Sequence, residues 1–142
     1  MLQSQQDATT VLAVDPGRDK CGLAVVEAEG RVLHQAIVST PDVARAAARL
    51  ITEYQADRLI VGDRTAASQV TRALREAHLP LAPVLVDEHR SSEEGRRRYF
   101  QDNPPRGWRR LLPTTLQTPG RAYDDYVAVV LAERYLSSLR NR

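Results

Sequence analysis

Cysteine and long hydrophobic runs are both scarce in this sequence. Cys21 is the only cysteine among 142 residues, so no disulfide can form within the chain. This favours a protein of the reducing cytoplasm. The longest apolar runs fall far short of the roughly 20 residues that a membrane-spanning helix needs, so we expect no membrane association. Residues 1–10 are polar and lack the apolar stretch of a secretory signal, which predicts a flexible tail.

A large excess of charge of one sign is also missing. The formal net charge is only +2, so overall charge does not by itself predict a nucleic-acid-binding protein. The distribution is more informative, because Lys20 is the only lysine and many arginines lie in one stretch: Arg90, Arg96, Arg97, Arg98, Arg106, Arg109, Arg110 and Arg121. The planar guanidinium group suits phosphate contacts, although a solvated helix surface would carry the same residues.

The pattern of apolar residues predicts an α/β fold. Short apolar runs predict strands at residues 11–14, 21–27, 31–38, 58–61 and 83–86, with a hairpin turn at Gly30. Helical spacing predicts helices at residues 41–54, 66–77, 91–100 and 123–139. Thr40 is the predicted N-cap of the first, and Ser91 and Glu94 form a predicted capping box in the third. Residues 102–119 predict a loop with a helical turn at 108–112.

The order of these elements predicts one mixed sheet. The first three strands form an antiparallel meander, and the later strands alternate with helices. We therefore expect helices on the sheet's faces, and a single domain over residues 1–142. Three strands end in acidic residues: Asp15, Asp63 and the pair Asp87-Glu88. Because ligands of such sheets bind beyond the carboxyl ends of the strands, this edge is the predicted functional site.

The first of these acids opens a longer motif. Residues 15–25 fit the pattern D-x-G-x(4)-G-x-A-V, with Asp15 at the end of a buried strand. An aspartate before proline and glycine is also a common turn sequence. The spacing to Gly22 favours a further role, because glycines let a hairpin pass close to a ligand.

The chain resembles the YqgF/RuvX family, whose members are relatives of the RuvC resolvases in the ribonuclease-H-like superfamily. That family opens with the same motif. Its second motif is roughly E-R-x-T-T-x-E-A, to which residues 88–95 correspond, and its third is an aspartate opening a closing helix that ends in Tyr-Leu. Asp125 and Tyr135-Leu136 match the third, and the resemblance spans residues 11–139. It implies a ribonuclease-H-like five-stranded sheet of a three-stranded meander plus two parallel strands.

The resemblance also implies an acidic metal site. Asp15, Glu88 and Asp125 would be both catalytic residues and ligands of two Mg²⁺ or Mn²⁺ ions, with Asp15 bridging them. Neighbouring strand residues point to opposite faces, so we expect Glu88 rather than Asp87 at the metals. The spacing to Tyr135-Leu136 favours Asp125 over Asp124, whose charge would then only interact with the helix dipole.

Several residues near these motifs are candidate nucleic-acid contacts: Lys20, Arg90, Arg96, Trp108, Arg109 and Arg110. Trp108 would stack on a base or, equally, anchor its loop by hydrophobic packing. His89 stands where the family has arginine, and residues 62–65 depart from the family's G-L-P-x-N. Whether Asp63, Asp87, His89 or Asp124 assists the reaction stays open.

The resemblance implies a nuclease for structured nucleic acid, and it favours RNA during 5′-end maturation of the pre-16S ribosomal RNA. Ribosomal precursor particles would then be partners. The alternatives are a junction-resolving DNA endonuclease, for which a homodimer would present two sites, and a non-catalytic nucleic-acid-binding module.

Overall fold

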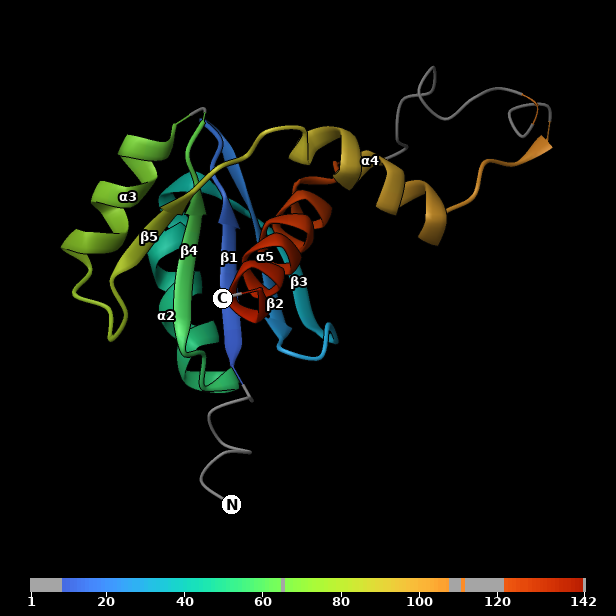
Figure 1. Cartoon of the computed structure of the whole chain (residues 1–142). Coiled ribbons are helices and arrows are strands. Elements are labelled where there is room, and N and C mark those ends of the chain that lie inside the picture. Colours follow the sequence, from blue (N-terminus) through green and yellow to red (C-terminus); the bar gives the residue numbers. More distant parts are fainter. Residues whose placement is uncertain (1–8, 65, 108–110, 112–121, 142) are drawn as a thin grey trace.

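Five strands form the central sheet of the protein. The computed structural model describes residues 9–64, 66–107, 111 and 122–141. The strands are β1 (Thr10–Asp15), β2 (Lys20–Glu27), β3 (Val32–Ser39), β4 (Arg58–Gly62) and β5 (Pro83–Val86). Their order across the sheet is β3-β2-β1-β4-β5, which makes β1 the central strand (Figure 1).

The sheet combines antiparallel and parallel pairing, as the sequence predicts. β1, β2 and β3 form the antiparallel meander, in which Asp15 is paired with Gly22. Gly30, with φ +91°, turns the chain between β2 and β3. β4 pairs with β1 in parallel, and β5 pairs with β4 in parallel. The predicted fold class is therefore confirmed.

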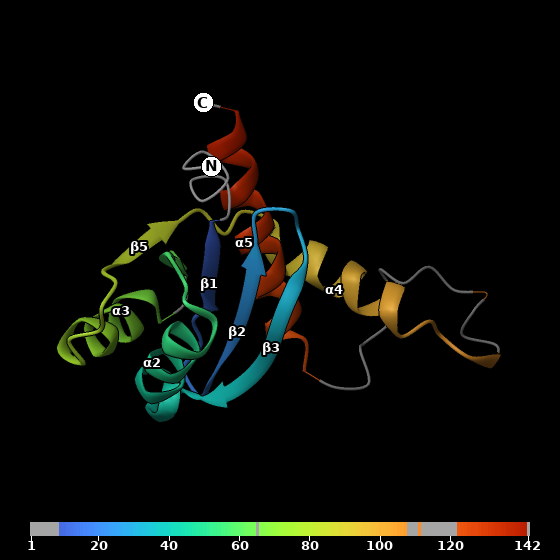
Figure 2. The same cartoon turned by 90° about the horizontal axis from the view of Figure 1, so that it is seen from below.

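Helices cover both faces of the sheet. They are the short 3-10 helix η1 (Thr40–Asp42), α2 (Val43–Tyr54), α3 (Ala67–Glu76), α4 (Ser91–Asp102) and α5 (Asp124–Arg140). α2 and α3 pack on one face, and α5 crosses the other over β1 and β2 (Figures 1 and 2). α4 packs on the start of α5 and extends away from the sheet (Figure 1).

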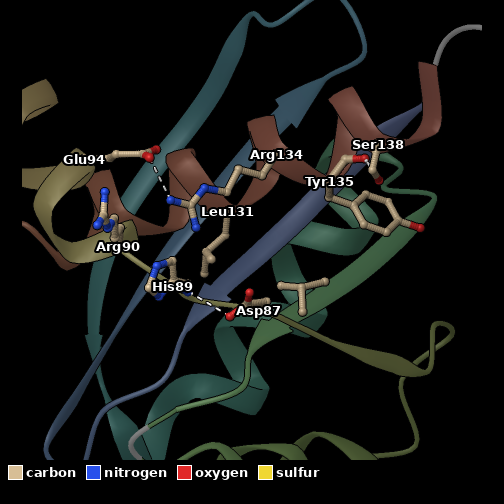
Figure 3. Close-up of a pocket in the computed structure, with 9 residues that line it drawn as sticks. Asp87, His89, Arg90, Glu94, Leu131, Arg134, Tyr135 and Ser138 are labelled. Carbon is tan, nitrogen blue, oxygen red and sulfur yellow. Dashed lines mark hydrogen bonds and ion pairs between the residues drawn. The ribbon is translucent and has the colours of Figure 1, made fainter. Parts of the chain in front are cut away.

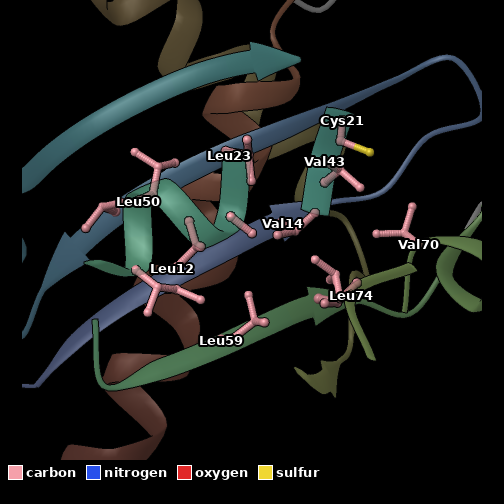
Figure 4. Close-up of a cluster of buried hydrophobic side chains, with 13 residues drawn as sticks. Leu12, Val14, Cys21, Leu23, Val43, Leu50, Leu59, Val70 and Leu74 are labelled. Carbon is pink, nitrogen blue, oxygen red and sulfur yellow. The ribbon is translucent and has the colours of Figure 1, made fainter. Parts of the chain in front are cut away.

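The alternation along β1 explains the two hydrophobic layers. Leu12 and Val14 join the core beneath α2 and α3, which is drawn in Figure 4, whereas Val11 and Ala13 join the core beneath α5. All four side chains are fully buried. A central strand covered on both faces is continuously apolar, so this run appears in the sequence without alternation between polar and apolar residues.

Two predicted helix starts are wrong. Thr40 is not an N-cap: its hydroxyl donates to the Gly17 carbonyl oxygen over 2.8 Å, which holds the loop after β1. Ser91 forms no capping box with Glu94, because its hydroxyl donates to the Glu88 carbonyl oxygen at 2.7 Å and Glu94 pairs with Arg134 instead. The Thr40 hydroxyl thus has a tertiary partner, and the Ser91 hydroxyl binds a carbonyl oxygen of the preceding turn instead of a helix N–H.

The predicted N-terminal tail is too long. Thr10 already belongs to β1, and its N–H donates to an Asp57 carboxylate oxygen at 2.8 Å. The prediction for residues 1–8 and most of the turn predicted at 108–112 lie outside the described residues. No helix in the described ranges is both long and apolar enough to cross a bilayer.

Candidate active site

Asp15 and Glu88 meet at the carboxyl end of the central strands. Asp15 is the last residue of β1, and Gly62 ends the neighbouring strand β4. Glu88 lies two residues beyond β5, and its side chain lies against Gly62, where any Cβ atom would overlap the Glu88 carboxyl group. The missing side chain at Gly62 therefore lets Glu88 reach across β4 to Asp15.

The contact between these two acids changes the protonation of Asp15. Burial, a hydrogen bond from one carboxyl group to the other, and the charges of Glu88 and Asp124 raise the pKa of Asp15 from 3.8 to about 9. With this pKa, Asp15 holds a proton at neutral pH. Two carboxyl groups in contact favour a single negative charge unless a cation joins them.

Backbone groups hold Glu88 in this position. Its Oε2 atom accepts the Arg64 N–H at 2.7 Å, and its own N–H donates to Asp63 Oδ1 at 3.2 Å. The Glu88 carbonyl oxygen accepts both the N–H and the hydroxyl of Ser91, at the start of α4. Asp63 thus contacts the backbone of Glu88, and the β4–α3 loop fixes the Glu88 carboxylate.

The start of α5 brings two further acids to this end of the sheet. At Gly22, a Cβ atom would overlap the backbone of Asp124, so β2 and α5 approach as closely as two backbones can. Asp125 is 4% exposed, and its Oδ2 atom accepts a hydrogen bond from Gln35 of β3 at 3.1 Å. Asp124 lies 3.9 Å from the Lys20 ammonium group.

The two α5 acids therefore occupy different surroundings. Successive helix residues point about 100° apart, so only one can face β1 closely. Asp124 is the one whose charge acts on the Asp15 carboxyl group, whereas Asp125 faces β3. The motif assigns the metal-ligand role to Asp125, and that assignment stays a prediction.

The donor atoms suit a hard divalent cation. Asp15 and Glu88 offer carboxylate oxygens in direct contact, and Asp124 adds a third carboxylate at the same edge, the ligand type that Mg²⁺ and Mn²⁺ prefer. Among the described residues, no three of the histidine, cysteine, aspartate or glutamate side chains stand at metal-binding distances from one another. The carboxylates suit Mg²⁺ or Mn²⁺ in chemistry. Asp124 lies farther from the Asp15–Glu88 pair than these two acids lie from each other.

The predicted nucleic-acid contacts are dispersed. Lys20 pairs with Asp124 beside the acids, and Arg96 is half-buried on α4. Arg90 has φ +60° at the start of α4, and it lines a cavity of about 510 Å³ between the β5–α4 loop and α5 (Figure 3). Trp108, Arg109 and Arg110 lie outside the described residues.

Asp87 and His89 line this cavity of about 510 Å³ rather than the Asp15–Glu88 site. Asp87 Oδ1 accepts the His89 N–H at 2.9 Å (Figure 3). Arg134 of α5 lines the opposite side and pairs with Glu94 at 2.8 Å. Asp87 and Glu88, both beyond the end of β5, therefore lie in different surroundings.

Three supporting residues were not identified from the sequence. Gly62 makes room for Glu88, the Arg64 N–H binds its carboxylate, and Gln35 holds Asp125. A glycine at a strand end signals close approach by another group, so Gly62 could have been found. A backbone N–H and a glutamine in an otherwise apolar hairpin carry no such signal.

Comparisons with known proteins agree on the fold. No protein-family model matches the chain, and no curated protein matches it in sequence. Thermus thermophilus RuvC in complex with a Holliday junction substrate is similar in structure, with a TM-score of 0.59 at 15% identity, covering 94% of this chain and 96% of that one. A second structure of Thermus thermophilus RuvC gives a TM-score of 0.55 at 13% identity, with the same coverage. The chain therefore has the ribonuclease-H-like fold of RuvC.

Proposed function

We propose that this chain is a divalent-metal-dependent nuclease that hydrolyses phosphodiester bonds at the Asp15–Glu88 site. The observation that carries the proposal is the direct contact of these two acids at the carboxyl end of the central strand. Burying two carboxyl groups against each other costs stability, and the Asp15 proton only partly offsets that cost. A cation with hard oxygen ligands explains why both acids are present.

Each residue then has a defined task. Asp15, once deprotonated, would hold the ion from the central strand. Glu88 is held ready by the Arg64 N–H, so little rearrangement is needed at its carboxylate. When bound, the ion polarises the phosphate and lowers the pKa of a coordinated water. The surrounding buried strands keep these charges in a fixed arrangement, in which they act more strongly than in water.

For the third carboxylate we favour Asp124, and Asp125 is the alternative that the motif supports. The charge of Asp124 already acts on Asp15, and its side chain is about one-third exposed. Asp125 is buried and engaged by Gln35. In this assignment Asp125 anchors α5 to β3, and Asp124 completes the acidic site.

Structured RNA is the proposed substrate, in 5′-end maturation of pre-16S ribosomal RNA. This rests on the three motifs shared with the YqgF/RuvX family, and it makes ribosomal precursor particles the natural partner. A four-way DNA junction is the second candidate, since a structural neighbour was solved with a Holliday junction substrate. That activity calls for a homodimer with two sites.

The first experiment is a cleavage assay with matched variants. Wild-type protein is incubated with Mg²⁺ or Mn²⁺ and with single- and double-stranded RNA, a precursor-rRNA mimic, single-stranded DNA and a four-way DNA junction. Asp15→Asn and Glu88→Gln keep side-chain shape and remove charge, and both should reduce kcat by at least about 1,000-fold. The preferred substrate decides between RNA maturation and junction resolution.

The same assay separates the α5 acids. Asp124→Asn should reduce kcat nearly as much as Asp15→Asn, and Asp125→Asn should mainly lower stability. The reverse result would return Asp125 to the site. If wild-type protein binds these nucleic acids yet cleaves none with either metal, the nuclease proposal fails and a binding module becomes the better explanation.

Metal binding is measured independently by thermal unfolding. Mn²⁺ should raise the Tm of wild-type protein relative to chelator, because the ion binds only the folded arrangement of acids. Asp15→Asn should show little of this shift.

A further inference from the structure

A groove of about 770 Å³ runs along α3 beside the acidic site. One wall is a single face of α3, the other is β5 with the exposed side chain of Leu85, and the β4–α3 loop closes one end. Figure 1 shows that this loop lies at the same end of the sheet as the start of α4, and that α3 runs from there alongside β5. The groove therefore begins at the active-site edge and leads away from it.

Three arginines line this groove: Arg64 in the loop, and Arg72 and Arg75 on α3. All three are exposed, and none has an ion-pair partner within the described part of the chain. Arg98 and Arg134, on the α4–α5 side, are each paired with a glutamate. The arginines of the groove are thus left for an external anion.

The groove also contains acids, and their surroundings limit their effect. Asp63 Oδ1 accepts the Glu88 N–H at 3.2 Å, so its carboxylate is turned toward the Glu88 backbone. Glu76 lies at the far end of α3, beside Arg75. The balance of charge in the groove stays positive.

The start of α3 favours the same ligand chemistry. α3 begins after Ala66, which has no side chain able to cap it, and its first turn contains no acid. Free N–H groups at a helix start attract anions, here next to three guanidinium groups.

The groove is connected to the active site through one loop. Arg64 lines the groove and donates its N–H to the Glu88 carboxylate at 2.7 Å. A strand of nucleic acid lying along the groove would therefore pass directly beside the acids. Leu85 offers an apolar surface for a sugar or base between successive phosphates.

We propose that the α3 groove binds the phosphate backbone of a nucleic-acid strand and leads it to the Asp15–Glu88 site. That the bound nucleic acid is then cleaved rests on the proposed nuclease function. Binding to the groove can be measured without cleavage. Arg72 and Arg75 contact phosphates in this arrangement, and Arg64 contacts the phosphate nearest the acids.

Binding is tested by fluorescence anisotropy in chelator, where no metal-dependent cleavage occurs. Short labelled single strands and duplexes of RNA and DNA are titrated at about 50 to 200 mM salt. The test variant is Arg72→Gln/Arg75→Gln, and the matched control is Arg45→Gln/Arg49→Gln, which removes two exposed arginines from α2. The test variant should bind about tenfold more weakly, with a log–log salt slope shallower by about 1.5 for two lost phosphate contacts. The control should bind like wild type.

The outcomes separate this proposal from the nuclease proposal. Equal binding by the two double variants would overturn the groove proposal even if wild-type protein cleaves. If only Arg72→Gln/Arg75→Gln loses binding and wild-type protein cleaves nothing, the groove proposal is supported and the nuclease proposal is overturned. Where cleavage occurs, the groove variant should raise KM at unchanged kcat, whereas Asp15→Asn lowers kcat. If poly-glutamate displaces the oligonucleotides at equal charge concentration, the groove recognises acidic polypeptides and the proposal fails.

The variant also needs a folding control. Arginine and glutamine have similar helix propensities and the replaced side chains are exposed, so the Tm should match wild type. Arg72→Lys/Arg75→Lys keeps the charges and should restore most of the salt dependence. Failure of the lysine variant to bind better than the glutamine variant would also contradict the proposal.

Discussion

The two halves of the acidic site are built around a glycine each, but they are built differently. On the β4–β5 half, Gly62 faces the side chain of Glu88. On the α5 half, Gly22 faces the backbone of Asp124. A side chain can move to another rotamer, whereas a helix start can move only if α5 shifts as a whole.

The acids of the two halves also differ in their partners. Asp15 is hydrogen-bonded to Glu88, and neither acid has an ion-pair partner in the described ranges. Asp124 has Lys20 and Asp125 has Gln35. The acids of the α5 half are thus stabilised by partners within the protein. The carboxyl groups of Asp15 and Glu88 lack a positively charged partner, and a cation could supply one. We infer that structural support and metal affinity are divided between the halves.

Gly22→Ala should give the largest effect on stability. The added methyl group would overlap the Asp124 backbone and push α5 away from β2. Overpacking against groups that cannot move costs about 3 kcal/mol or more of the free energy of unfolding. Urea denaturation measures this, and a cost below about 1 kcal/mol would show that α5 adjusts and that the two halves are equally adaptable.

Asp15→Asn should remove the pH dependence of stability that the Asp15–Glu88 pair causes. The pKa of Asp15 is raised to about 9 in the folded protein, from an ordinary value of 3.8 that applies when unfolded. The unfolded chain therefore binds fewer protons between these values, so the stability present below pH 3.8 is lost as pH rises toward 9. The slope relative to Asp15→Asn is at most about 1.4 kcal/mol per pH unit.

Urea denaturation of both proteins across pH 5–8 in chelator tests this expectation. At the alkaline end, Asp15→Asn should be the more stable protein. Parallel stability curves would mean that Asp15 is ionised throughout. Adding Mn²⁺ should reduce the slope of wild type only, because the ion replaces the proton.

Gly62→Ala should have a smaller effect on stability and a large one on the site. The methyl group would displace the Glu88 side chain, which can rotate away at a cost of about 1 kcal/mol. Loss of the contact with Glu88 should also weaken the pH dependence that Asp15 causes. A cost as large as that of Gly22→Ala, measured in the same urea experiment, would remove the distinction between the two halves.

The sequence predicts the sheet better than it predicts the site. Apolar runs and the turns between them identify β1 to β5. The pattern is strongest for β1, β2 and β4, which are almost entirely buried. Asp15 and Glu88 follow such runs directly, so their meeting at one edge could be expected. The starts of helices were less predictable, since the hydroxyls of Thr40 and Ser91 both donate to backbone carbonyl oxygens outside the helices, at Gly17 and Glu88.

The surroundings of Asp124 and Asp125 show where sequence reasoning stops. A motif places an acid within one residue along a helix, but one residue is about 100° of rotation. Which of the two faces Asp15 depends on how closely α5 approaches β2, and that distance is set by Gly22 on another element. The α3 groove likewise forms only when the loop after β4 and the α3 face come together.

Lys20→Gln should change stability least. The Lys20 ammonium group lies 3.9 Å from the Asp124 carboxylate, and the two side chains are 53% and 31% exposed. Water screens such a pair, so its loss should cost no more than about 0.5 kcal/mol in urea denaturation. If Lys20 instead contributes several times this amount, Asp124 is a structural residue held by its ion pair. Asp125 would then be the third carboxylate of the site. In that case α5 would carry both a structural acid, Asp124, and a metal-binding acid, Asp125.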